Sequence, residues 1–172
     1  GGITVSGHFT NSGTLLPAVH GVTFNGGTAQ NLTLQVPTTF AGLTVASNTT
    51  LIETVVAANA SVAGTLRNQG VIRKRQAVSG LGQHTFGLAG HHGNGADVVV
   101  HVTERTGADP LTALQVDRID ANHPQAPGSN ATETYWVITP TGSNHTFNLT
   151  LPHTGLSAPH VCGNAGDGSS DW

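Results

Sequence analysis

The fold is decided by the stretch V-S-G-H-F-T-N-S-G-T-L, residues Val5–Leu15. Its odd positions are apolar, small or Asn and its even positions are Ser, His or Thr, which is the alternation of a strand with one buried face. The same pattern returns further along the chain in V-A-G-T-L-R-N-Q-G-V-I, residues Val62–Ile72. Because both copies carry an Asn followed two residues later by Gly, we expect Asn11 and Asn68 at corners, where an Asn side chain bonds its own backbone.

The interval between the two copies divides into three equal steps, and apolar residues recur at each step, at Val5, Phe24, Leu43 and Val62. A period of about 20 residues is the length of one coil of a β-solenoid, in which successive coils stack their short strands into parallel sheets. We therefore expect a β-solenoid over residues 1–75. The alternative is an antiparallel β-sandwich with evenly spaced hairpins.

The second half of the chain has a different texture. After a Ser-Gly-Leu-Gly break at residues 79–82, turn-forming segments separate five strand candidates, which cover residues 84–88, 97–104, 111–119, 135–139 and 145–151. Short strands at such spacings predict a small antiparallel sandwich. The whole chain is therefore predicted to be all-β, with a solenoid-like repeat region at 1–76, an antiparallel β-sandwich at 77–153 and a Gly/Ser-rich tail at 154–172.

The composition excludes several classes of protein. Only 9% of the 172 residues are charged, against about 25% in an ordinary soluble domain. With one lysine, three glutamates and no methionine, the chain lacks the residues that build long amphipathic helices, so an all-α fold is excluded. A net charge of -3 gives almost no long-range field, so we expect no nucleic-acid partner. The sequence contains no run of about 18 apolar residues, so we expect no membrane span.

Several segments of the first half are similar to one another and to a known kind of repeat, namely residues 7–13, 22–27, 40–45 and 64–70. They resemble the repeats of large bacterial secreted surface proteins of the filamentous-haemagglutinin and adhesin type. The second half, with residues 116–124 and 135–140, looks like a sandwich module that often follows such repeats. The resemblance implies an exported, β-rich protein at the cell surface or in extracellular fibres, and it carries over no catalytic residues.

Two functions from different classes fit these observations. The first is an extracellular structural protein that assembles with copies of itself into a surface filament or coat by β-strand complementation. Its subunit interface is expected along the uncharged N-terminal segment, at Ile3, Val5, Phe9 and Leu15. The second is an adhesive or carbohydrate-binding module of a larger cell-surface adhesin, with glycans or other cell surfaces as partners. We expect neither an enzyme nor a cofactor, because the sequence shows no set of acid, base and nucleophile.

Ten histidines make a metal site worth considering. His84, His91, His92 and His101 lie close together in the sequence, and two of them occupy a Gly-rich turn. Neighbouring residues of a strand point to opposite faces, and neither HxH nor HExxH spacing occurs in this cluster. We therefore expect scattered histidines and no metal, with a metal site as the alternative.

The densest polar cluster contains Asp117, Arg118, Asp120 and His123. The alternation of side chains along a strand turns Asp117 and Arg118 to opposite faces, so we expect a structural pair between Arg118 and a carboxylate that holds a loop. A calcium or ligand site is the alternative. Trp136 is expected in the sandwich core, with a sugar-stacking surface as the alternative.

Two residues have the chemistry for covalent crosslinks. Lys74 is the only lysine, and an isopeptide bond to a nearby Asn or Asp would lower the intact mass by one ammonia or one water. Cys162 is the only cysteine, which excludes an intramolecular disulfide. A free thiol is expected at Cys162, and a bond to a cysteine of another chain is the alternative.

Overall fold

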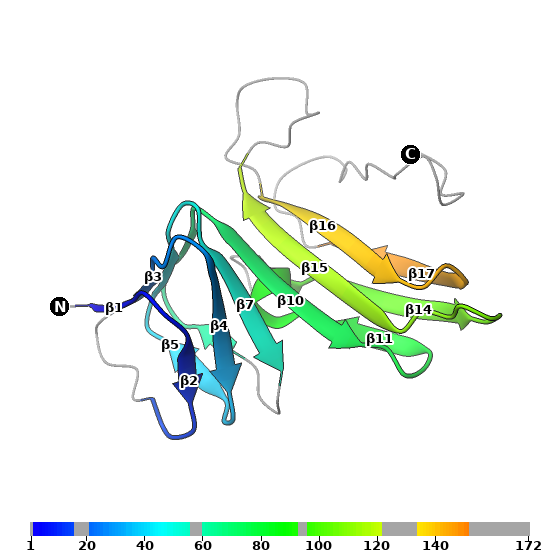
Figure 1. The fold of residues 1–172 in the computed structure, drawn as a ribbon, viewed down its shortest axis with the longest axis horizontal. Coiled ribbons are helices and arrows are strands. Elements are labelled where there is room, and N and C mark those ends of the chain that lie inside the picture. Colours follow the sequence, from blue (N-terminus) through cyan, green and yellow to red (C-terminus); the bar gives the residue numbers. More distant parts are fainter. Residues whose placement is uncertain (1, 16–20, 56–59, 93–95, 122–133, 152–172) are drawn as a thin grey trace.

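The structure is a computed structural model that describes residues 2–15, 21–55, 60–92, 96–121 and 134–151 (Figure 1). These residues are almost entirely β, which confirms the predicted all-β class. The first half contributes ten strands, β1 (Ile3–Val5), β2 (Phe9–Asn11), β3 (Val22–Phe24), β4 (Ala29–Leu34), β5 (Thr38–Phe40), β6 (Leu43–Val45), β7 (Thr50–Val55), β8 (Ala60–Val62), β9 (Leu66–Asn68) and β10 (Val71–Ala77).

These ten strands form a β-solenoid. All of their pairings are parallel, in the order β1-β3-β6-β9 for one face, β2-β4-β7-β10 for the second and β5-β8 for the third. Successive register partners on the first face are Ile3, Val22, Leu43 and Leu66, so each coil is longer than the one before it. The equal spacing predicted from the sequence is therefore wrong after the first coil, because the later corners contain additional residues.

The solenoid interior is filled by alternate residues of each strand. In β4 the side chains of Gln30, Leu32 and Leu34 are buried, whereas those between them point outward. Phe24 and Phe40 are fully buried on the other two faces. The period-2 alternation of the sequence thus becomes an inside and an outside of each coil.

The two copies of the sequence repeat occupy different positions in the coil. Val5 lies in β1 on the first face, whereas Val62 lies in β8 on the third. The repeat therefore encodes a local strand-corner-strand unit and not one fixed position per coil. Both corners form as predicted, because Asn11 Oδ1 accepts the backbone N–H of Gly13 and Asn68 Oδ1 accepts that of Gly70, each at 3.2 Å.

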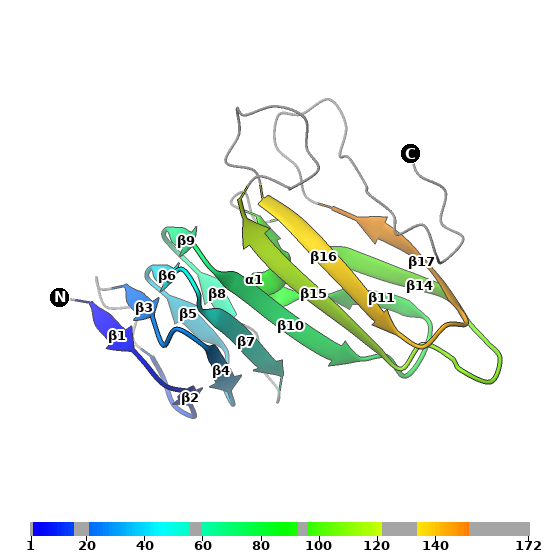
Figure 2. The same cartoon turned by 45° about the horizontal axis from the view of Figure 1, so that its top comes forward.

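The second half forms a β-sandwich that is continuous with the solenoid. Its elements are β11 (Gly82–Thr85), α1 (Gly87–Gly90), β12 (His91–His92), β13 (Ala96–Asp97), β14 (Val99–Arg105), β15 (Ala113–Asp120), β16 (Thr134–Thr141) and β17 (His145–Thr150). One sheet is the six-stranded β16-β15-β10-β7-β4-β2, and the other is β11-β14-β17 (Figure 2). The buried side chains of Val100, Val102, Leu114 and Val116 belong to the same core as those of the solenoid.

β10 connects the two halves. It pairs parallel with β7 of the solenoid on one side and antiparallel with β15 of the sandwich on the other. The predicted boundary at residue 76 lies within β10, so it remains a division by sequence texture. The tail at 154–172 lies outside the described residues.

One predicted strand is wrong. The strand expected at residues 84–88 ends at Thr85, and a short helical turn follows. Gly87 adopts a φ of +40°, which turns the chain out of the extended conformation. Leu88 and Ala89 are then buried against β8, β10 and β15, where they close the C-terminal end of the solenoid core. Within the described ranges, no helix has the length and apolar character needed to cross a membrane.

Candidate functional site

The N-terminal end of the solenoid carries two free strand edges. Among the described residues, β1 pairs only with β3, and β2 pairs only with β4. A free edge presents unpaired backbone N–H and C=O groups, to which another strand can bind. We call these two edges, together with the side chains of Ile3, Val5, Phe9 and Leu15, the open end.

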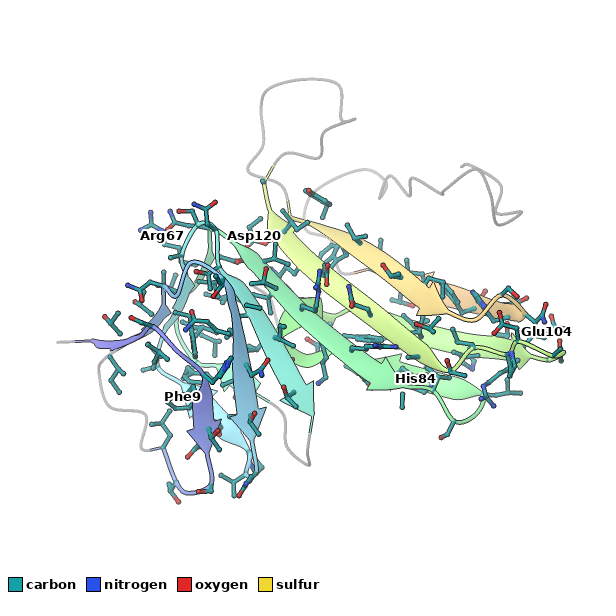
Figure 3. The ribbon with its side chains drawn as sticks, viewed as in Figure 1. Phe9, Arg67, His84, Glu104 and Asp120 are labelled. Atoms are coloured by element: carbon teal, nitrogen blue, oxygen red, sulfur yellow. The ribbon has the colours of Figure 1, made fainter. Side chains whose placement is uncertain are left out.

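The side chains of the open end continue the solenoid core outward. Phe9 is half-buried, and its ring packs edge-on against that of Phe24, with 6.1 Å between centroids, and lies 6.3 Å from that of Phe40 (Figure 3). Val5 and Leu15 are also half-buried against the core. Ile3, in contrast, is 48% exposed. The structure thus brings three of the four predicted interface residues onto one core and leaves the fourth in solvent.

No ionised side chain protects the open end. Residues 2–15 contain neither Asp, Glu, Lys nor Arg. The one titratable side chain in this segment is His8, whose Nδ1 accepts the backbone N–H of Asn31 at 2.9 Å, just before the first paired residue of β2. Charges and prolines are the usual protection of edge strands, so the open end is an unprotected edge.

The far edge of the same six-stranded sheet is different. It is formed by β16, which contains Pro140, and proline has no N–H to donate to a further strand. The C-terminal end of the solenoid interior is filled by Leu88 and Ala89. The two ends of the solenoid are therefore unlike, since one is closed and the other is open.

A buried ion pair lies beneath α1, and the sequence reasoning missed one of its members. Glu53 of β7 and Lys74 of β10 are register partners in the parallel sheet. Their side chains are 1% and 2% exposed, and Lys74 Nζ lies 3.5 Å from Glu53 Oε1. The predicted partner of Lys74 was Asn or Asp. The available signal was a Glu at a buried position of the alternation, one coil before the lysine.

The carboxyl of Glu53 is in an apolar environment. Burial raises the pKa of Glu53 above its ordinary value of 4.5, although the charge of Lys74 and hydrogen bonds from the backbone act in the opposite direction. Oε2 accepts the N–H of Leu88 at 3.2 Å. Among the described residues Oε1 accepts no hydrogen bond. The uncharged acid is therefore favoured relative to a carboxyl in water.

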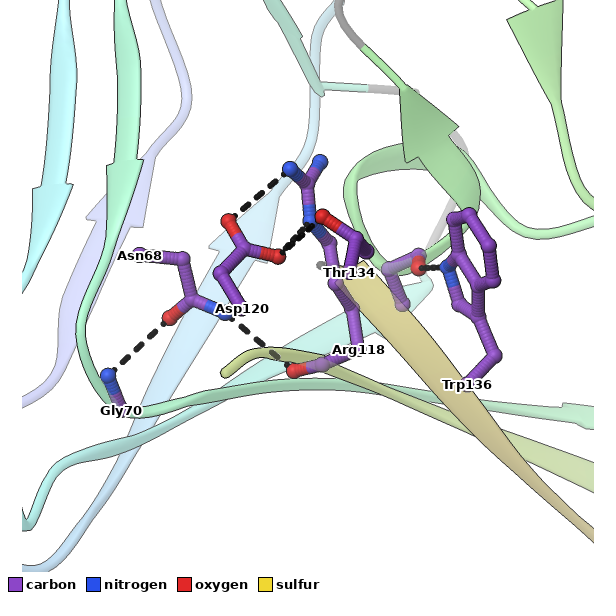
Figure 4. Close-up of polar contacts among 7 residues, drawn as sticks. Asn68, Gly70, Arg118, Asp120, Thr134 and Trp136 are labelled. Atoms are coloured by element: carbon purple, nitrogen blue, oxygen red, sulfur yellow. Dashed lines mark hydrogen bonds and ion pairs between the residues drawn. The ribbon is translucent and has the colours of Figure 1, made fainter. Parts of the chain in front are cut away.

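The polar cluster of β15 is structural. Arg118 and Asp120 share a face of the strand, with Nε to Oδ1 at 2.8 Å and Nη2 to Oδ2 at 2.9 Å (Figure 4). Thr134 Oγ1 donates to Asp120 Oδ1 at 3.0 Å. Asn68 Nδ2 donates to the backbone carbonyl of Arg118 at 3.2 Å, which ties the solenoid corner to the sandwich. The expected pair between Arg118 and a carboxylate is thus formed with Asp120, while His123 lies outside the described residues.

The opposite face of β15 has its own ion pair. Arg73 of β10 donates to both oxygens of Asp117, at 2.8 Å through Nε and 2.6 Å through Nη2. The carboxylate raises the pKa of the Arg73 guanidinium, mainly through this hydrogen bonding. Asp117 and Arg118 therefore face opposite ways, as the alternation predicted, and neither carboxylate of the cluster is left to bind a ligand alone.

Trp136 points inward. Its Nε1 donates to the backbone carbonyl of Ala89 at 2.9 Å, and its ring packs on the core (Figure 4). Ile138 packs on the same core, whereas Val137 is 43% exposed on the other face. This placement matches the predicted core role and removes the indole from any sugar-binding surface.

The histidines do not form a cluster in the part of the chain that the structure describes. No group of three or more His, Cys, Asp or Glu side chains with the spacing of a metal site occurs there. His84 lies on β11, and His101 is exposed on β14. The side chains of His91 and His92 and all of Cys162 lie outside the described residues, so the metal and thiol alternatives stay predictions.

Comparisons with known proteins found no relative. No protein-family model matches the chain, and no curated protein or solved structure matches it. The resemblance to repeats of the filamentous-haemagglutinin and adhesin type therefore stays a prediction from the sequence. The function is inferred from the geometry of the described residues.

Proposed function

We propose that this chain is an exported structural protein that assembles with other copies of itself, through the open end, into an extracellular filament or coat. The observation that carries the proposal is the pair of free edges of β1 and β2, without Pro or ionised side chains. Both edges belong to sheets that continue through the molecule. An edge strand of a neighbouring copy would extend these sheets by backbone hydrogen bonds.

Assembly at the open end also satisfies the side chains there. A neighbouring strand beside β1 and β2 would cover the exposed part of Ile3 and the outer side of the Phe9 ring. Burial of apolar surface stabilises an interface by roughly 25 cal/mol per Å² before the costs of association. The outward turn of Val137 and the inward turn of Trp136 give no comparable support to the carbohydrate-binding alternative.

The substitution Ile3→Lys tests the proposal directly. Ile3 is already 48% exposed, so a lysine leaves the fold intact and puts a charge beside the edge of β1. We expect self-association to weaken at least tenfold, or about 1.4 kcal/mol, in sedimentation velocity and in the yield of fibres by negative-stain microscopy.

Val137→Lys is the matched control, because Val137 has a similar exposure and lies on the proline-containing edge strand β16. It should assemble as the unmodified chain does. Equal assembly of Ile3→Lys and the unmodified chain would contradict the proposal. Deletion of residues 1–15 is a weaker test, because it would expose the edges of β3 and β4 in the next coil.

The assembly should also resist salt. Because residues 2–15 contain no Asp, Glu, Lys or Arg, the interface depends on backbone pairing and apolar contact. Such contacts should survive about 1 M NaCl, where the Debye length is near 3 Å. Sedimentation at pH 7 with low and high salt measures this, and dissociation by salt would point to ion pairs in place of strand pairing.

A further inference from the structure

The contact between Lys74 and Glu53 has unusual geometry for an ordinary ion pair. The two residues face each other across neighbouring parallel strands, and their charged atoms are 3.5 Å apart. Almost no part of either side chain reaches solvent. Glu53 Oε1, the oxygen nearest to the amine, accepts no hydrogen bond from the described residues, whereas Oε2 is held by the N–H of Leu88.

Gly87 closes this site against water. A Cβ atom on Gly87 would lie 2.7 and 2.8 Å from the two carboxyl oxygens of Glu53 and 2.9 Å from Nζ of Lys74. The Cα of Gly87 therefore packs directly over all three atoms, and no side chain larger than hydrogen fits there. The amine and the carboxyl are thus confined together in a dry space, at the point where α1 covers the end of the solenoid.

We propose that Lys74 and Glu53 are joined by an amide bond between Nζ and Cδ. In the uncharged pair, the Nζ lone pair attacks Cδ, and the C–N bond forms. The bond from Cδ to Oε1 then breaks, and the hydroxyl leaves with one proton of the amine as water. The products are one secondary amide and one water molecule, so no oxidant, activating group or other reactant is needed.

Three features of the site favour this reaction. Burial disfavours the ions and therefore favours the neutral amine and acid that react. The N–H of Leu88 is placed to stabilise the negative charge that develops on Oε2 during attack. Fixed proximity replaces a bimolecular encounter, and effective molarities of about 10⁵–10⁸ M are reached in well-oriented intramolecular reactions.

The amide would have a mechanical consequence. Glu53 lies in β7, and Lys74 lies in β10, the strand shared by solenoid and sandwich. A covalent link between them would prevent the last coil from separating from the sandwich under tension. This consequence suits a fibre subunit, but the amide rests on the geometry at residues 53, 74 and 87 and does not depend on the proposed assembly.

The intact mass of the denatured full chain tests the proposal without any variant. We expect a mass lower than that of the sequence by one water, and a peptide map in which the segments around residues 53 and 74 form one branched peptide that reductant does not separate. The full sequence mass would overturn the proposal. A loss of water mapped to any other pair of residues would also overturn it.

Substitution at position 53 adds a signature that an unrelated dehydration would not give. Glu53→Gln would release ammonia in place of water, and the crosslinked variant should therefore have the same final mass as the crosslinked unmodified chain. Glu53→Ala has no acyl group and should keep its full sequence mass. A chain whose loss of water persists in Glu53→Ala would contradict the assignment, whatever the stability of that variant.

Discussion

The variant Lys74→Met should be less stable than the double variant Lys74→Met/Glu53→Leu by about 3–5 kcal/mol near pH 7.5. Removal of the amine leaves the Glu53 carboxyl in a dry core without its cation, because the side chain is 1% exposed. The double variant replaces both groups by apolar side chains that suit this environment. Neither variant can form the proposed amide, so the comparison measures the isolated carboxyl. Chemical denaturation with a common m-value measures the difference.

The difference between these two variants should depend on pH in a defined direction. Burial raises the pKa of Glu53 above 4.5, and loss of Lys74 removes a charge that lowers it. The folded Lys74→Met chain then binds a proton more tightly than the unfolded chain. Its free energy of unfolding falls as pH rises from 4.5 toward the raised pKa, whereas that of the double variant lacks this fall. The difference should therefore nearly vanish below about pH 4.5.

The control is the neighbouring pair between Arg73 and Asp117. The Arg73 side chain is 36% exposed, so solvent screens this pair. Arg73→Met should cost about 1 kcal/mol, with little of the pH dependence described above. A single variant Lys74→Met as stable as the double variant at pH 7.5 would show that Glu53 is not isolated in the core.

The second large effect is expected at glycines of the sequence repeat. Gly64→Ala and Gly70→Ala should each lower the free energy of unfolding by about 2–3 kcal/mol, because overpacking forces the backbone to shift. A Cβ at Gly64 would lie 2.2 Å from the carbonyl oxygen of Ala41. A Cβ at Gly70 would lie 2.2 and 2.6 Å from two backbone carbonyl oxygens of the preceding coil. In thermal unfolding the expected loss is about 4–8 °C.

The chain supplies matched controls in the first copy of the same repeat. Gly7 corresponds to Gly64, and Gly13 corresponds to Gly70. A Cβ on Gly7 or Gly13 would meet nothing within 4 Å, because these glycines lie in the first coil. Gly7→Ala and Gly13→Ala should therefore be neutral or stabilise the fold by up to about 1 kcal/mol. Equal losses at all four positions would mean that the glycines are needed for local conformation and not for space.

The sequence predicts local structure well where a contact spans only a few residues. The Asn corners are an example, because Asn11 reaches a backbone N–H only two residues further along the chain. The inward turn of Trp136 is another, since alternation along a strand fixes which residues share a face. The open-end residues were also predictable as strand residues, from their uncharged alternation.

Two features of the candidate sites needed the tertiary structure. The pairing of Glu53 with Lys74 depends on coil length, and the coils lengthen from the first to the third without any periodic signal in the sequence. The helical turn at residues 87–90 replaced a predicted strand because its apolar residues fill the end of the solenoid. Such closure is a property of the stacked coils and is not visible in the segment itself.

The sequence by itself therefore determined the all-β class, the strand-corner unit and the residues that face inward. Alternation and corner chemistry are local, and each acts within a few residues of the chain. The tertiary structure decided the register between coils, the closed and open ends, and the space around each glycine. These depend on residues at least one coil apart in the sequence, whose distance is set by how many residues each corner holds. Gly7 and Gly64 occupy the same place in the repeat, yet only the second has a carbonyl oxygen of an earlier coil above it.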